Sequence, residues 1–555
     1  MLTLEQSLHT QDLGYIQIVA ELWEASVDAS GLQDAILSLT PRLLEQTRLN
    51  EMLQKLPQEG REALDDLLRN QGMLPWSLFT RRHGEVREMG PARRDRERPH
   101  LHPISAAETL WYRALIGRAF FDSPQGPQEF AYIPRDLLQL MPQPPTPQGA
   151  PLGRAATPAE RAVIITANDH ILDHACTYLA ALRLSFSETQ IAAIGAAWQS
   201  PAVRNPYPLT PNALHEILNT AGLIGANNMP VPDMTRYFLE LPRAKALAQL
   251  GRNWRHSPDF NELRLIPELF FEGEWQNDPL RARYAILDFL ATLPKDIWWN
   301  LNSFIQDIYH TQPDFQRPAG DYDSWYIRSK ASGEYLRGFE HWEEVDGALI
   351  RFTILGPLHW LGFIDLAAPT PDSPPTAFRF SAWAEALLAG IPPEGIAQED
   401  ETLLLSSDAR IRAPRRVPRS VRYQIARFSE WSGQTDDSYL YRLTPASLQR
   451  ARAQGLRVNH LLTLLRRYAL TVPPSMAKAL ERWHQHGTEA RLERLLVLRL
   501  RTPDMLNMLR ASRAARFLGE PLGPTTIIVK PGAQEKVLSI LAEMGFLGEA
   551  RLEEE

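Results

Sequence analysis

Prolines and glycines crowd one internal segment of the chain, PQPPTPQGAPLGRAATP at residues 142–158. Proline removes a backbone hydrogen-bond donor and glycine loses the most entropy on ordering, so neither a helix nor a strand can run through this segment. The chain must therefore fold as separate parts on either side of it. A length of 555 residues also exceeds what one hydrophobic core can organise, and we expect three or four domains.

The spacing of apolar residues predicts an α+β protein that is predominantly α-helical and multidomain. Between residues 105 and 140 a helix is followed by a turn and a short extended segment, as at the end of a winged-helix unit. Between about 280 and 390 a helical stretch leads into a strand, a loop and a second strand, which resembles a wing. We assign a helical N-terminal domain with a basic and acidic surface segment (1–100), a winged-helix-like helix–strand unit (101–145), a helical domain (159–275), a winged-helix-like domain with an aromatic insertion (276–395), an α+β domain (402–520) and a C-terminal strand and helix (521–555).

The composition is that of a globular protein of a reducing compartment. No run of about 18 apolar residues is present to span a membrane. The N-terminal residues lack the basic stretch of a signal peptide. Cys176 is the single cysteine, which excludes an intramolecular disulfide and a cysteine-rich zinc site. We therefore expect a cytoplasmic protein without a membrane partner.

Charge is distributed unevenly along the chain. Residues 410–520 contain 21 arginines and one lysine against eight acids, a net charge of +14, which leaves −21 for the rest because the whole chain carries −7. Such asymmetry favours a polyanion as the partner of the basic part. The alternative is that these arginines pair with the acidic remainder of the chain.

Arginines that could contact nucleic acid concentrate within a short stretch interrupted by Pro414 and Pro418. The prolines prevent one continuous helix, so we expect an extended loop from which the guanidinium groups fan out toward phosphates. The candidate nucleic-acid-binding residues are Arg410, Arg412, Arg415, Arg416, Arg419 and Arg422, joined by Arg450, Arg466 and Arg467 if their helices share a face.

A family resemblance rests on five motifs in this region. They are LLLSSDARIRAP (403–414), ARFSEW (426–431), YRLTPASLQRARAQG (441–455), LLTLLRRY (461–468) and VPPSMAKALERWHQHG (472–487). In order and spacing, residues 402–500 resemble the accessory, non-motor domain of XPB-type DNA helicases, which also occurs in bacterial helicase-associated proteins. The resemblance implies a C-terminal XPB-accessory-like α+β domain and a role in DNA repair or transcription.

Motifs for catalysis are missing from the chain. There is no Gly-Lys dipeptide and hence no phosphate-binding loop, no DExH box and no GxSxG elbow. The pair His170 and His174 has the spacing of a zinc helix, but no third ligand is near and we favour a structural role. We therefore predict that the protein is not an enzyme and has no catalytic residues, no metal site and no cofactor.

Aromatic residues are dense between residues 313 and 347. Packing against a core is the first interpretation and partner or nucleic-acid binding the second. The candidate partner-binding residues are Trp325, Tyr326, Tyr335, Phe339 and Trp342. A third interpretation is a carboxylate-based hydrolase that uses Asp314, Asp321, Asp323 and Glu343 from the same segment.

These observations favour a non-catalytic DNA-binding or helicase-associated adaptor. The expected partners are DNA and a helicase or nuclease acting in trans, with no small-molecule cofactor. The alternative is a protein-interaction scaffold that makes no direct contact with nucleic acid, and the carboxylate hydrolase ranks third.

Overall fold

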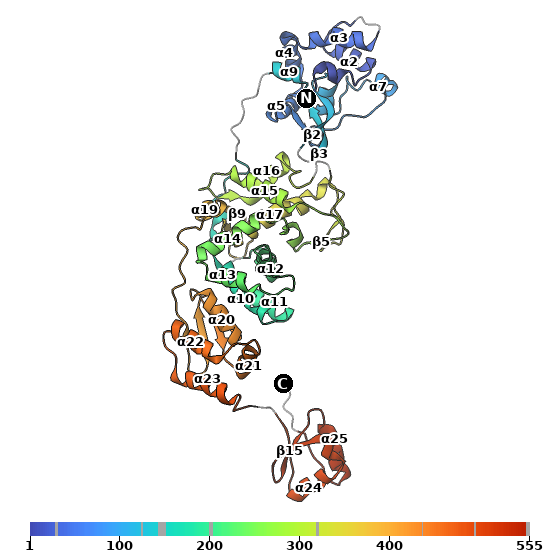
Figure 1. The fold of residues 1–555 in the computed structure, drawn as a ribbon. Helices are drawn as coiled ribbons and strands as arrows, with labels where there is room; N and C mark the ends of the chain where they lie inside the picture. Colours follow the sequence, from blue (N-terminus) through green and yellow to red (C-terminus); the bar gives the residue numbers. More distant parts are fainter. Residues whose placement is uncertain are drawn as a thin grey trace. The chain divides into compact units, whose positions relative to one another are not determined.

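The computed structural model describes residues 1–27, 31–123, 126–141, 151–198, 204–317, 321–435, 437–492 and 495–550. It is mixed helix and sheet, 49% helical and 14% strand, which confirms the predicted α+β class (Figure 1). Of the predicted linker at 142–158, residues 142–150 lie outside the described residues. Within the described parts, no helix is both long and apolar enough to cross a bilayer.

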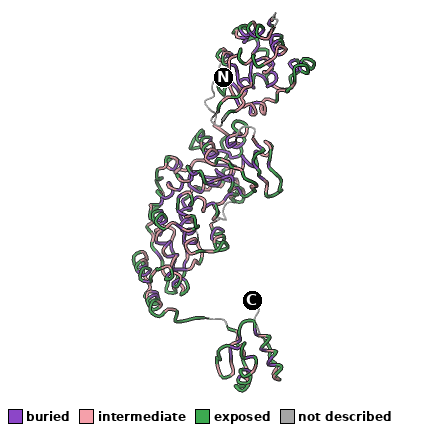
Figure 2. The backbone as a smooth tube through the Cα atoms, turned by 45° about the vertical axis from the view of Figure 1, so that its right-hand side comes forward, coloured by how far each residue is buried: buried purple, intermediate pink, exposed green. Residues whose placement is uncertain are grey.

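The chain divides into two compact units. The first comprises Met1–Leu404, Arg410–Arg442 and Arg467–Leu470, and the second Leu405–Ala409, Leu443–Arg466 and Thr471–Glu555. In both, buried residues line the inner faces of helices and sheets, while exposed residues follow the outer turns (Figure 2).

The N-terminal part of the first unit is a helical bundle with a small sheet. Its elements are α1 (Leu4–Leu8), α2 (Leu13–Leu22), α3 (Leu32–Leu43), α4 (Gln46–Lys55), α5 (Gln58–Arg69), β1 (Met73–Pro75), α6 (Trp76–His83), α7 (Pro91–Glu97), α8 (Ala106–Tyr112), β2 (Gly117–Ser123), β3 (Gly126–Tyr132) and α9 (Arg135–Leu140). The strands are ordered β1-β3-β2 and antiparallel, and one hydrophobic core extends from Leu4 to Met141. The predicted division at residue 100 therefore falls inside a single core.

The central part of the first unit surrounds a four-stranded sheet ordered β4-β8-β9-β6. Its elements are β4 (Val163–Ile165), α10 (His170–Arg183), α11 (Glu188–Ala196), α12 (Pro211–Thr220), α13 (Pro232–Glu240), α14 (Arg243–His256), β5 (Leu269–Phe271), α15 (Pro279–Ala291), β6 (Trp299–Asn300), α16 (Leu301–Thr311), β7 (Ile327–Ser329), α17 (Ala348–Leu355), α18 (Pro357–Trp360), β8 (Ile364–Ala368), β9 (Ala377–Phe380) and α19 (Ala384–Leu388). Strand β4 pairs with β8 across the predicted boundary at 275, so residues on both sides of it share one sheet.

The C-terminal elements begin with a strand–helix–hairpin segment that belongs to the first unit. It contains β11 (Arg410–Pro414), α20 (Arg419–Phe428), β12 (Glu430–Thr435) and β13 (Ser438–Arg442), preceded by the short strand β10 (Leu404–Leu405). Strand β13 pairs antiparallel with β11 on one side and with β12 on the other. Helix α20 packs against α10 and α13 of the central part.

The second unit contains the last helices and a three-stranded sheet ordered β14-β16-β15. Its elements are α21 (Pro445–Ala453), α22 (Val458–Tyr468), α23 (Pro474–His486), β14 (Leu496–Arg499), α24 (Pro503–Ala511), β15 (Leu518–Gly523), β16 (Thr526–Val529) and α25 (Gln534–Glu543). Thr444 caps α21 in a capping box with Ser447, as its TPAS sequence predicts. The predicted boundary at 520 falls within β15.

Candidate nucleic-acid interface

The stretch from Arg410 to Arg422 is not an extended loop. Pro414 ends β11, and Pro418 immediately precedes the first residue of α20. Proline is tolerated at strand ends and at helix starts, so the two prolines delimit regular elements instead of interrupting them. The expectation that all six guanidinium groups fan out from a loop is therefore corrected. Three of them belong to a buried cluster, two lie on an exposed sheet face, and Arg416 is partly exposed between the two elements.

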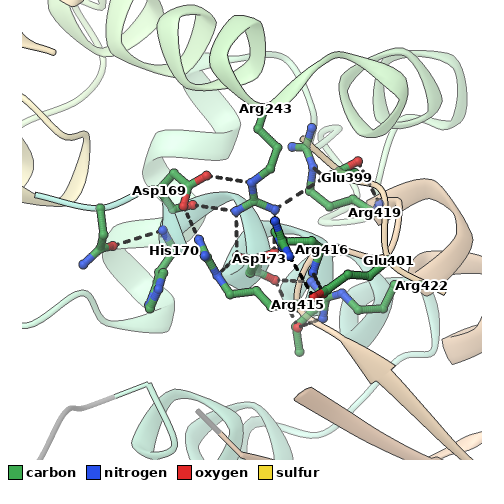
Figure 3. Close-up of polar contacts among 12 residues, drawn as sticks. Asp169, His170, Asp173, Arg243, Glu399, Glu401, Arg415, Arg416, Arg419 and Arg422 are labelled. Atoms are coloured by element: carbon green, nitrogen blue, oxygen red, sulfur yellow. Dashed lines mark hydrogen bonds and ion pairs between the residues drawn. The ribbon is translucent and has the colours of Figure 1, made fainter. Parts of the chain in front are cut away.

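The buried cluster joins Arg415, Arg419 and Arg422 to acids from distant parts of the chain (Figure 3). Its centre is Asp173 on α10, whose carboxylate accepts bonds of 3.0 and 2.8 Å from the two terminal nitrogens of Arg243 and a third bond of 3.0 Å from Arg415 Nε. Asp169, one turn earlier, accepts from Arg243 Nε at 2.6 Å and also pairs with Arg415. The side chains of Asp173 and Arg243 are only 1% and 2% exposed.

Glu399 extends this network to the start of α20. Its carboxylate accepts from Arg419 Nε at 2.6 Å and from the Arg419 backbone N–H at 3.2 Å. A carboxylate at a helix N-terminus also complements the helix dipole. Arg419 is fully buried and donates a further bond of 2.7 Å to the carbonyl oxygen of Leu241.

Arg422 is fully buried as well. It donates to Thr177 Oγ1 at 2.7 Å and to the carbonyl oxygen of Asp173 at 2.6 Å, and its guanidinium lies 3.8 Å from the centre of the Tyr439 ring. With their donors directed inward, Arg419 and Arg422 are not placed to bind an external phosphate. Arg416 is different, because its side chain is 42% exposed and pairs with Glu401 at 3.2 Å.

Electrostatics in the cluster favour the charged state of Asp173. Burial alone would raise the pKa of this carboxyl group, but the hydrogen bonds and positive charges of Arg243, with Arg422 and Arg415 nearby, outweigh burial and lower the pKa to about 2. The same acids raise the pKa of Arg243. The cluster is therefore an ion-pair network that remains charged at neutral pH.

The exposed sheet face carries Arg410, Arg412 and Arg442. Side chains alternate along a strand, so Ile411, Ala413 and their neighbours Tyr439 and Tyr441 are buried. Arg410 lies directly opposite Arg442 in the β11–β13 register, and Arg412 is two residues along on the same face. Arg412 Nε donates to Ser438 Oγ at 2.9 Å. We call Arg410, Arg412 and Arg442 the arginine face.

The remaining predicted arginines lie on other elements of the chain. Arg450 on α21 and Arg466 on α22 belong to the second unit, where Arg466 lies 3.8 Å from Glu481. Arg467 is exposed and lies over the ring of its neighbour Tyr468 at 5.2 Å.

The five candidate aromatic residues also fall into two groups. Trp342 is fully buried, with its indole N–H donating to the carbonyl oxygen of Pro313 at 2.9 Å, and Trp325 is buried and stacked on Trp275 at 5.0 Å. Phe339 is half-buried and stacks on Tyr309. Tyr326 and Tyr335 are exposed.

The residues of the metal and hydrolase interpretations have other partners or are exposed. Within the described ranges, no group of three or more histidine, cysteine or acidic side chains could hold a metal ion. Of the four acids, Asp314 accepts from Tyr322, Asp321 accepts from Ser324, Glu343 pairs with Arg351, and Asp323 is exposed.

Sequence reasoning missed the acidic half of the cluster. Asp169 and Asp173 stand out in the sequence only as neighbours of the two histidines, and nothing local marks Arg243 or Glu399. A signal was present: Asp173 interrupts the apolar run HILDHACTYLAAL. A carboxylate on a buried helix face requires a buried cationic partner.

Comparison with known proteins relates this region to helicases. Residues 403–521 match the family described as helicase conserved C-terminal domain. A segment of 162 residues is 31% identical to the DNA 3'-5' helicase XPB of Kineococcus radiotolerans (strain ATCC BAA-149 / DSM 14245 / SRS30216) and covers 28% of this chain and 28% of that protein. The match thus spans less than a third of the length of that relative, and it identifies this chain as helicase-related.

The comparison corrects one prediction. The absence of a phosphate-binding loop led to the expectation that the protein is not an enzyme. The matches over residues 403–521 and with an XPB helicase point instead to helicases, which are a family of enzymes. The prediction of a helicase-related protein is confirmed at this level.

Proposed function

We propose that this protein binds DNA through the arginine face and works in a helicase system of DNA repair or transcription, with a helicase or nuclease as partner. One observation carries the proposal: Arg410 and Arg442 lie opposite each other on neighbouring strands, with Arg412 on the same exposed face. The likeness of residues 403–521 to a helicase domain supports DNA as the polyanion.

The charges on the arginine face suit an external anion. On this face Arg442 lies between Arg410 on β11 and Glu430 on β12. The three arginines thus outnumber the one carboxylate of the same face, and an external phosphate can bind to this excess of positive charge by charge-assisted contacts. The inner arginines are unsuitable for this role, since they are buried against Asp169, Asp173 and Glu399. The exposed face is therefore the part of the basic segment that suits an outside anion.

The proposal also includes two domain assignments. We infer that residues 402–500 correspond to the accessory domain of XPB-type helicases, as their motifs suggest. We also infer that the N-terminal part contains a winged-helix-like unit. Its support is the succession α5, β1, α6, α8, β2 and β3 with strand order β1-β3-β2, since a helix followed by strand, turn and strand is the pattern of a wing.

Salt-dependent DNA binding tests the proposed function. The dissociation constant of a fluorescein-labelled duplex is measured by anisotropy over a range of KCl concentrations for the wild type and for R410Q/R412Q/R442Q. Each lost phosphate contact reduces the slope of log affinity against log salt by about 0.9 for duplex DNA, so the triple variant should lose about 2 to 3 units of slope.

A charge-matched control separates this face from general electrostatics. R93Q/R154Q/R236Q removes three positive charges from exposed side chains elsewhere in the chain. It should bind duplex DNA with nearly the wild-type slope. Equal slopes for the wild type and the arginine-face variant, or no duplex binding by the wild type, would refute the proposal.

A further inference from the structure

A small two-stranded sheet of β5 and β7 in the central part, extended by an isolated bridge to Tyr335, has one face built from aromatic and cationic side chains. Strand β5 pairs with β7 in the register Phe270↔Arg328, and Arg328 also bridges to Tyr335 on the following segment. Two backbone hydrogen bonds, from Ser329 N–H to the Glu334 carbonyl at 3.0 Å and from Leu336 N–H to the Ile327 carbonyl at 2.9 Å, hold residues 334–336 beside β7.

Strand alternation divides the small sheet into an inner and an outer side. Leu269, Ile327 and Leu336 are buried, at 3%, 1% and 6% exposure, and point inward. The alternating positions point outward. These outward residues are Glu268, Phe270, Glu272, Tyr326, Arg328, Lys330, Tyr335 and Arg337, and we call them the aromatic face. Glu268 lies opposite Lys330, whose backbone N–H donates to the Glu268 carbonyl oxygen at 2.9 Å, so three cations and two acids share the face.

Three large rings of this face are open to solvent: Phe270 is 49% exposed, Tyr326 45% and Tyr335 37%. The two tyrosine rings are nevertheless held in position. Arg337 lies 4.8 and 4.9 Å from the centres of Tyr326 and Tyr335. Arg328 lies 4.0 Å from the Tyr335 ring, and the Tyr335 hydroxyl bonds Arg328 at 2.6 Å and Glu272 at 2.7 Å. Fixed rings lose little conformational entropy when a flat ligand stacks on them.

The charge of the aromatic face suits an anion. Glu272 neutralises Arg328 at 3.1 Å. In the part of the chain that the structure describes, neither Arg337 nor Lys330 has a carboxylate within ion-pair distance. The face therefore combines three exposed rings with two cations that are available to phosphates.

We propose that the aromatic face binds single-stranded DNA, whose bases stack on Phe270, Tyr326 and Tyr335 while Lys330 and Arg337 contact the backbone. Every base offers a flat π-surface, and proteins that hold single strands without sequence preference combine stacking rings with nearby cations. The inference rests on the proposed function, because separated strands are what a DNA helicase system generates. It assigns duplex to the arginine face and single strand to the aromatic face.

The test uses the full-length chain and a labelled oligothymidylate of about 12 nucleotides, which forms no duplex. Stacking contributes about 1–3 kcal/mol per base, so F270A/Y326A should weaken oligothymidylate binding at least about tenfold in an anisotropy titration. F270Y/Y326F keeps the rings and should bind like the wild type. Y237A, which removes a tyrosine that is 57% exposed on α13, is the control for loss of an exposed ring.

A second variant tests the cations. K330Q/R337Q should reduce the salt slope of oligothymidylate binding by about 1.4 units, which corresponds to two phosphates of a single strand. Duplex binding should stay unchanged in both aromatic-face variants, while the arginine-face variant should lose duplex binding and keep oligothymidylate binding.

The outcomes separate this inference from the proposed function. If the wild type binds duplex but not oligothymidylate, or if F270A/Y326A binds oligothymidylate as well as the wild type, the aromatic face is no single-strand site although the proposed function stands. If the arginine-face variant keeps full duplex binding while the aromatic-face variants lose oligothymidylate binding, the proposed function fails and the inference survives as a separate DNA site.

Discussion

Asp173 and Arg243 form a two-pronged ion pair, in which both terminal nitrogens of the Arg243 guanidinium donate to the Asp173 carboxylate at 3.0 and 2.8 Å. Arg415, which lies between β11 and α20, adds a bond of 3.0 Å to the same carboxylate. The pair thereby connects α10 and α14 to the segment that the helicase family matches. In this chain the arginines that follow the arginine face in sequence are part of the packing between these elements.

Substitution of Asp173 by Asn should destabilise the packing of α10 and α14 against the segment around Arg415. Loss of one partner from a buried ion pair leaves uncompensated positive charge and costs about 3–5 kcal/mol. Hydrogen exchange of the amides in α10 and α20 should accelerate by at least about a hundredfold. D233N removes the acid of an exposed pair with Arg236 and should leave exchange within about twofold of wild type. Unchanged protection from hydrogen exchange in D173N would show that the packing of these elements does not depend on the Asp173 carboxylate.

Acid should lower the stability that the Asp173 ion pairs contribute, in a defined pH range. The pKa of Asp173 is about 2 in the folded protein, against the ordinary aspartate value of 3.8 that we take for the unfolded chain. A lowered pKa means that the stabilisation is fully present above pH 4 and is lost as the pH falls from about 4 to 2. The loss should reach about 2 kcal/mol in wild type. Thermal unfolding measured across this range should show a smaller decline for D173N.

His174 predicts a second pH effect at milder acidity. Burial lowers its pKa from 6.5 to about 3, and the ring stacks on Trp198 at 4.6 Å. Among the residues that the structure describes, the buried Nδ1 has no hydrogen-bond partner. The unfolded chain takes up a proton below pH 6.5 and the folded chain does not, so stability declines as the pH falls from about 6.5 to 3.

Replacement of His174 by Phe keeps the ring and removes the titration. The H174F variant should lose most of this decline, about 2–4 kcal/mol, in denaturant unfolding followed from pH 7 to 4. His9 is exposed, and H9F should follow the wild type. A decline of the same size in H174F would assign the pH dependence to other groups.

In the C-terminal part, the sequence predicted the helices and strands better than it predicted which arginines are buried. The strand SYLYRL and the capped helix TPASLQRARA are present as β13 and α21. Pro414 and Pro418 predicted breaks in a loop, because a local pattern cannot distinguish a proline that interrupts an element from one that delimits it. The acids that bury Arg419 and Arg422 lie far away in sequence, and no local pattern pairs them.

Arg419 and Arg416 are close in sequence but should differ strongly in their contribution to stability. Arg419 is fully buried and bonded to Glu399 and Leu241, whereas the Arg416 side chain is 42% exposed. R419A should reduce the free energy of unfolding by about 3 kcal/mol or more, since Glu399 would remain without its main partner. R416A should cost at most about 0.5 kcal/mol. Urea denaturation followed by tryptophan fluorescence measures both, and equal effects would contradict the division between buried cluster and exposed residues.

In the aromatic segment at 313–347, too, the local sequence does not predict which side chains are buried. Its many aromatic residues predicted either packing or binding, and the structure has both buried and exposed rings. Side chains alternate between the two sides of the chain as it enters β7, so Trp325 is buried and Tyr326 is exposed. Which ring faces inward depends on the pairing of β7 with β5, more than 50 residues earlier in the chain. The first interpretation, packing, holds for Trp325 and Trp342.

Trp342 should therefore matter for stability and Tyr326 should not. Trp342 is fully buried, donates to the Pro313 carbonyl at 2.9 Å and contacts Tyr309 edge to face at 5.1 Å. W342A should lower the free energy of unfolding by about 3–5 kcal/mol through the lost burial and the cavity left behind. Y326A removes an exposed ring and should change it by at most about 0.5 kcal/mol. If urea denaturation instead found Y326A as damaging as W342A, Tyr326 would be part of the core, and the aromatic face would lose the rigid and accessible ring on which a base is expected to stack.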